Sequence, residues 1–224
     1  MLYVRVQPLQ TLDDLKAALQ NAILLEFSTI PPYLTALYTI QPGTNVEVAA
    51  IIRGIAIEEM LHMCLACNIL NAVGGQPVLN AAGFPPTYPG PLPMGIGSEP
   101  GEPFIISLQK LSMALVRNVF MVIEEPEDPL HFPVQRAAMA AALPDYHTIG
   151  EFYAAVIALI GHLGPSIFTG DPKLQVTGWF PGDELFPVTD VATAQQAIGI
   201  IVAQGEGSST NPLDEEGQLA HYYR

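Results

Sequence analysis

Basic residues are scarce in this sequence, which holds 8 lysines and arginines against 22 aspartates and glutamates, for a formal net charge of −14. Such an excess of negative charge repels a phosphate backbone, so we expect no nucleic-acid partner. Cysteines are also few: Cys64 and Cys67 are the two in the chain, which excludes a four-thiolate zinc site. Their CLAC spacing lies in an apolar helical stretch and favours two small core residues one turn apart over a redox motif.

Long hydrophobic runs are missing as well. No apolar segment approaches the roughly 20 residues that a membrane-spanning helix needs, and the start MLYVRVQPLQ lacks the apolar region of a signal peptide. We therefore expect a soluble, cytoplasmic protein with no membrane partner.

What the chain does contain is a high proportion of apolar residues. Hydrophobic residues make up 50% of it and charged residues 13%, which predicts helices buried on more than one face. A length of 224 residues is enough for one large core, so we expect a single domain over residues 1–224. The apolar composition is also compatible with a homodimer.

A first long helix is predicted over residues 12–40. Apolar residues recur there every three or four positions, which is typical of a helix packed in a bundle. One member of this stripe is a carboxylate, Glu26. Pro31 and Pro32 follow about a turn later and predict a kink or an interruption of the helix.

A second long helix is predicted over residues 46–73, where Gly74 and Gly75 end it. This helix is apolar nearly all round, and Glu59 and His62 interrupt its buried stripe.

The remaining chain alternates shorter helices with two long loops rich in proline and glycine. Loops of this length are functional or form a packed cover, and we interpret both as insertions in one domain. The predicted loops span about residues 75–105 and 164–188, and the predicted helices span residues 106–124, 146–163 and 190–204, with a short last helix after Asp214.

The sharpest local signal is the sequence Glu59-x-x-His62. Positions i and i+3 of an α-helix lie on nearly the same face, so both side chains can reach one metal ion. The surroundings are apolar, where an unpaired buried carboxylate would be costly. Di-iron carboxylate bundles use one Glu from each of two helices and a Glu-x-x-His from each of the other two, and Glu26 fits the single-Glu role. Oxygen and imidazole donors suit iron, manganese or zinc.

The second half of the chain contains no second Glu-x-x-His, so single residues must supply the other ligands. Glu151 lies in an apolar helix four residues after His147. Glu206 ends another helix, and His221 lies on the short helix that follows. Several residues remain open as replacements for one of these ligands: Glu58, Glu124, Glu125 and His147.

Several strings in one order resemble the ferritin-like domain of the iminophenyl-pyruvate dimer synthase family: LEFSTIPPYLTALYTI, IRGIAIEEMLHMCLACNILNAVGGQP, FPPTYPGPLP, TIGEFY, QGEG and LAHYYR. The similarity covers nearly the whole chain. It implies an all-α, ferritin-like four-helix bundle and two iron ions, with manganese or zinc as alternatives. The metal ligands that it implies are Glu26, Glu59, His62, Glu151, Glu206 and His221.

The activity that this resemblance implies is that of a metal-dependent oxidoreductase for a small organic substrate, such as an amino-acid-derived imine. Tyr33 and Tyr38 lie near the first ligand and could line a substrate pocket, although core aromatics of a bundle helix have the same pattern. Two other functions compete with this hypothesis. One is iron handling of the ferroxidase type, which the long loops disfavour because they would obstruct packing into a cage, and the other is a non-catalytic, metal-stabilised module.

Overall fold

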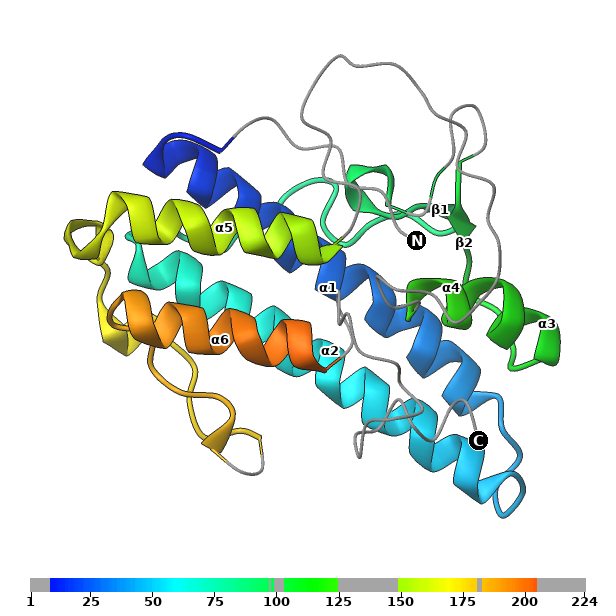
Figure 1. The fold of residues 1–224 in the computed structure, drawn as a ribbon. Coiled ribbons are helices and arrows are strands. Elements are labelled where there is room, and N and C mark those ends of the chain that lie inside the picture. Colours follow the sequence, from blue (N-terminus) through cyan, green and yellow to red (C-terminus); the bar gives the residue numbers. More distant parts are fainter. Residues whose placement is uncertain (1–8, 97, 99–102, 125–148, 181–182, 205–224) are drawn as a thin grey trace.

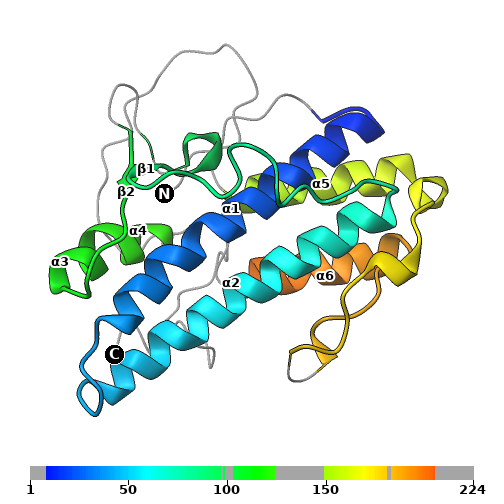
Figure 2. The ribbon, with the colours of Figure 1, turned by 180° about the vertical axis from the view of Figure 1, so that it is seen from behind.

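The computed structural model describes residues 9–96, 98, 103–124, 149–180 and 183–204. Its framework is two long antiparallel helices, α1 (Leu12–Tyr38) and α2 (Val46–Ala72). Two shorter helices, α5 (Ile149–Leu163) and α6 (Val191–Ala203), lie side by side over one half of this pair (Figures 1 and 2). Among the helices of these ranges, none has both the length and the apolar composition that crossing a membrane requires.

These four helices form a closed ring. Helix α1 packs on α2, α2 on α6, α6 on α5, and α5 on α1, and neighbours run in opposite directions (Figure 1). Fully buried aliphatic side chains from all four helices fill the centre, which is how an amphipathic bundle gains most of its stability. They include Leu15, Leu19, Ile23, Leu65, Ile69, Val156, Ile160, Ala194 and Ile198.

Of the kink or interruption predicted at Pro31 and Pro32, the interruption is wrong, because α1 continues through both prolines. Proline cannot donate an amide hydrogen, so Pro32 leaves the carbonyl group of Ser28 without its bond inside the helix. The hydroxyl group of Tyr88 donates to that carbonyl oxygen at 2.7 Å. Tyr88, 60 positions away in the sequence, thus replaces one of the two helical hydrogen bonds that the prolines cannot form.

The predicted helix over residues 106–124 begins later in the structure. Strand β2 (Ile105–Ile106) instead pairs antiparallel with β1 (Gly90–Pro91). The helical segment then starts after Ser112, whose hydroxyl oxygen accepts a hydrogen bond from the amide of Leu115 at 3.1 Å and so caps it. It consists of α3 (Met113–Leu115), the π-helical turn η2 (Val116–Phe120) and α4 (Met121–Ile123).

Helices α2 and α6 agree with their predicted bounds to within one residue. Asp190 caps α6, since its carboxylate accepts the amide of Thr193 at 2.8 Å. The predicted start of α5 at residue 146 and the predicted last helix after Asp214 lie outside the described residues.

Both long loops are packed covers. The first, which includes the 3-10 turn η1 (Pro93–Gly95), is fastened to α1: the side chain of Gln20 forms hydrogen bonds with the backbone of Val78 at 2.8 and 3.2 Å. The second includes the 3-10 turns η3 (Pro165–Ile167) and η4 (Pro172–Leu174) and is fastened to α2. There the buried side chain of Asn68 forms hydrogen bonds with both backbone groups of Val176.

Candidate metal centre

Three predicted ligands meet in the middle of the long helix pair. Glu26 projects from α1, and Glu59 and His62 project from one face of α2. One ligand atom from each residue lies within 4.8 Å of those from the other two. Their side chains are 0%, 2% and 3% exposed, so this polar group lies inside the apolar bundle.

Two atoms of this group that could bind a metal have no hydrogen-bond partner within the described protein. Within the part of the chain that the structure describes, Oε2 of Glu26 and Nδ1 of His62 are buried and have no hydrogen-bond partner. These two atoms are 3.8 Å apart, beyond hydrogen-bonding distance. Each unmet buried polar atom costs about 1–3 kcal/mol, and a cation between them would satisfy both. The residues present therefore fit a metal ion.

Burial raises the pKa of Glu26 to about 7. Hydrogen bonds from Tyr153 and Glu59 partly oppose that shift, and the charge of Glu124 adds to it. The pKa of Glu124 is also raised to about 7 by burial, against a hydrogen bond from Tyr33. Carboxylates gathered in this way cannot all ionise at neutral pH without a compensating positive charge.

Burial has the opposite effect on His62 and lowers its pKa to about 4, although a hydrogen bond with Gln204 raises it somewhat. The imidazole is therefore neutral at physiological pH, which is the form that binds metal. Its Nε2 atom lies 2.9 Å from Oε1 of Gln204, the residue that ends α6.

Glu124, considered above as a replacement ligand, lies beside this group. Its side chain is 9% exposed and accepts a hydrogen bond from the hydroxyl of Tyr33. Its charge acts on Glu26 and also on Glu58, the half-buried neighbour of Glu59 whose pKa burial raises to about 7. The structure thus brings a further carboxylate to the edge of the site.

The remaining predicted ligands are not placed. Helix α5 carries the backbone of Glu151 in its first turn, two residues before Tyr153. Nothing is described of the Glu151 side chain. The other candidates lie outside the described residues: Glu125, His147, Glu206 and His221.

Of the two tyrosines considered for a pocket, Tyr33 is fully buried and Tyr38 is 79% exposed at the end of α1. Tyr38 is therefore not a core aromatic, and its proposed place beside a substrate pocket stays a prediction. Sequence reasoning missed two residues that contact the site, Tyr153 and Gln204. Both lie in strings that carry the family resemblance, TIGEFY and QGEG, and those strings were the available signal.

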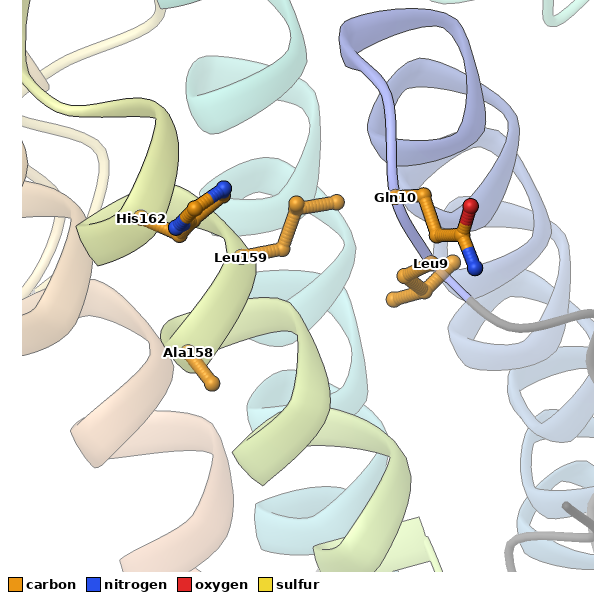
Figure 3. A pocket seen from close by; sticks show the side chains of 5 residues that line it. All are labelled: Leu9, Gln10, Ala158, Leu159 and His162. Carbon is orange, nitrogen blue, oxygen red and sulfur yellow. The ribbon is translucent and has the colours of Figure 1, made fainter.

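A hollow of about 510 Å³ lies elsewhere, between the start of α1 and the second half of α5. Its lining is mostly apolar, with His162 facing Leu9 and Gln10 across the gap (Figure 3). His162 follows Tyr153 by nine residues, roughly 13 Å along the helix axis, so the hollow is separate from the Glu26 site.

Comparison with known proteins agrees with the fold. The family description "Ferritin-like" matches residues 19–224. A ferritin-like protein from Caulobacter vibrioides is 32% identical in sequence and superposes with a TM-score of 0.66. That match covers 90% of this chain and 70% of the other. A comparison with curated proteins finds no match. The predicted all-α bundle is confirmed, and the chain belongs to the ferritin-like family.

Proposed function

We propose that this protein is a metal-dependent oxidoreductase that holds two iron ions in its bundle and acts on a small organic substrate. The observation that carries the proposal is the convergence of Glu26, Glu59 and His62 on one buried point. Two of their donor atoms lack hydrogen-bond partners among the described residues, which is costly unless a cation is bound.

The protein side of the site has defined roles. Glu26, Glu59 and His62 hold one ion, and Glu124 contributes a further carboxylate charge beside them. Glu151, Glu206 and His221 complete the ligand set in this proposal, as the family resemblance implies. Bound iron would supply one-electron redox chemistry and oxygen binding. The buried apolar surroundings exclude bulk water and strengthen the electrostatic contacts between the carboxylates and the metal.

The substrate class that we propose is an amino-acid-derived imine, joined oxidatively as in the iminophenyl-pyruvate dimer synthases. Support comes from the sequence strings that resemble that family over nearly the whole chain. The two long loops fastened to α1 and α2 are consistent with this substrate class, because a covered site keeps water away from a redox reaction on an organic molecule.

The metal site is tested by elemental analysis after anaerobic loading with Fe(II) and removal of unbound ion. Three proteins are compared: the wild type, the double variant Glu59→Ala, His62→Ala, and the control Glu47→Ala. Glu47 lies on the same helix but is exposed, so the control removes a carboxylate without touching the site. We expect about two irons per chain in the wild type and the control, and none in the double variant at unchanged helicity. Equal iron in all three proteins would contradict the site.

The reaction is tested separately with iron-loaded protein, oxygen or peroxide, and indole-3-pyruvate imine. Coupled product from the wild type but not from the double variant would support the substrate class. Oxidation of Fe(II) without turnover of any aromatic imine would instead indicate iron handling.

A further inference from the structure

Gln204 bridges the candidate metal site and a loop residue. Its Oε1 atom lies 2.9 Å from Nε2 of His62. Its Nε2 atom donates a hydrogen bond to Oε1 of Glu184 at 3.2 Å. The three side chains come from three separate elements: α2, the end of α6, and the loop before α6.

The chemistry of this chain of contacts fixes the position of a proton. An ionised carboxylate only accepts hydrogen bonds, so Glu184 requires the amide nitrogen of Gln204 to face it. The amide oxygen must then face His62, and an amide oxygen also only accepts. Nε2 of His62 therefore carries the hydrogen. A neutral imidazole has one N–H, so Nδ1 keeps a free lone pair.

Nδ1 is also the atom that points into the site. It lies 3.8 Å from Oε2 of Glu26, and it is the buried nitrogen without a hydrogen-bond partner among the described residues. The bridge through Gln204 thus leaves the lone pair of His62 on the side of the carboxylates, where a cation would bind.

We propose that Gln204 and Glu184 are positioning residues that hold His62 in the Nε2–H tautomer and present Nδ1 to the metal. This inference rests on the proposed metal-binding function. A hydrogen-bonded partner on the second nitrogen of a metal-binding histidine fixes its ring and commonly raises metal affinity about 10–100-fold.

The position of Glu184 is itself set by α2. Two residues after Glu184, the backbone carbonyl of Phe186 accepts a hydrogen bond from the Asn68 side chain at 3.2 Å. Asn68 is buried on α2, six residues beyond His62, and also binds the backbone of Val176 at 2.7 and 2.9 Å. The helix that carries the histidine therefore also anchors the loop that orients it, which gives this loop a role beyond covering the bundle.

The first test is the tautomer of His62 in metal-free protein, read from ¹⁵N NMR of labelled histidines and assigned with a His62→Ala spectrum. We expect the Nε2–H form in the wild type. Gln204→Leu removes the acceptor and should give a mixture of tautomers, and Glu184→Gln should do so partly because the Gln204 amide is then free to flip. The control Asp183→Asn changes the adjacent exposed carboxylate in the same loop and should leave the spectrum unchanged.

The second test is the affinity of the same four proteins for Zn(II), measured by competition with a chelator. We expect a loss of about 10–100-fold in Gln204→Leu, a smaller loss in Glu184→Gln and none in Asp183→Asn. An Nδ1–H tautomer in the wild type, or wild-type tautomer and affinity in both test variants, would overturn the inference. Wild-type protein that binds no metal but has the Nε2–H tautomer would refute the proposed function and the presentation of Nδ1 to a metal, leaving only the tautomer assignment.

Discussion

The hydroxyl group of Tyr153 in α5 donates a hydrogen bond to Oε1 of Glu26 in α1. Both side chains are fully buried, and the contact joins residues 127 positions apart. The bond stabilises the ionised form of Glu26 and so opposes the increase in pKa that burial causes. It occupies one carboxylate oxygen and leaves Oε2 facing His62.

Tyr153→Phe should therefore weaken metal binding without abolishing it. Loss of the hydrogen bond raises the pKa of Glu26 further and frees its side chain to rotate, so we expect Zn(II) affinity to fall by about 10-fold. Competition with a chelator measures this. Tyr38→Phe is the matched control, because Tyr38 is 79% exposed on the same fold, and its affinity should equal that of the wild type. Wild-type affinity in Tyr153→Phe would show that this hydrogen bond does not tune the site.

Metal affinity should rise with pH up to about 7 and level off above it. Burial lowers the pKa of His62 to about 4, so the imidazole does not hold a proton that a cation must displace in this range. Glu26 and Glu124, with pKa values raised to about 7, hold the protons that a cation must displace. Titration calorimetry in buffers of different ionisation enthalpy should detect proton release at pH 6. Glu124→Gln should release fewer protons, and binding without proton release would contradict this account.

Metal-free protein should lose stability as pH rises from about 5 to 7. The folded state keeps a proton on Glu26, whose pKa is about 7, whereas in the unfolded chain the pKa of this carboxyl is the ordinary 4.5 and the proton is lost. His62 acts oppositely over much of the same range, because the unfolded chain binds its proton as pH falls from 6.5 towards 4, and this offsets the effect of one carboxylate. The net change is still a loss of stability, because the pKa of Glu124 is also raised to about 7.

The variant Glu26→Gln isolates the first effect. In chelator at pH 7 we expect its free energy of unfolding to exceed that of the wild type by roughly 1–3 kcal/mol, with a smaller difference at pH 5. Urea unfolding followed by circular dichroism measures both. A variant less stable than the wild type at pH 7 would mean that Glu26 is stabilised by contacts other than protonation.

The long helices and part of the site could be predicted because helical periodicity is local. The spacing of Glu59 and His62 fixes them on one face of α2, and the apolar stripe of α1 places Glu26 on the face that packs against them. No comparable rule exists for Gln204 or Glu184. Gln204 is not a usual type of metal ligand, Glu184 lies in a loop where no helical spacing relates it to the site, and the contacts of both depend on where a loop and a helix end meet.

Two structural predictions were wrong, the start of the helix at residue 106 and the interruption of α1. Both depend on contacts between segments that are distant in the sequence. Ile106 is apolar and begins the predicted helix, but in the structure it and Ile105 pair with residues 90–91 from the preceding loop. The interruption expected in α1 follows from the chemistry of proline alone, and it is avoided through a partner that the local sequence does not contain, Tyr88.

Removing that partner should destabilise the protein. Tyr88→Phe leaves the Ser28 carbonyl oxygen without its donor in a part-buried position, and we expect the free energy of unfolding to fall by about 1 kcal/mol. Chemical unfolding measures the loss, with the exposed Tyr38→Phe as control. An unchanged free energy would mean that water replaces the hydroxyl without cost.

Because Pro31 and Pro32 have no amide hydrogen, the backbone hydrogen bonding of α1 is not uniform along its length. Pro31 and Pro32 take two bonds out of the ladder between Glu26 and Tyr33, so the helix is more compliant there than on either side. Glu26 belongs to the stiff segment before this joint. Tyr33, which holds Glu124, belongs to the segment after it. The stretch of α1 that lacks two backbone hydrogen bonds therefore lies between Glu26 and the tyrosine that hydrogen-bonds Glu124.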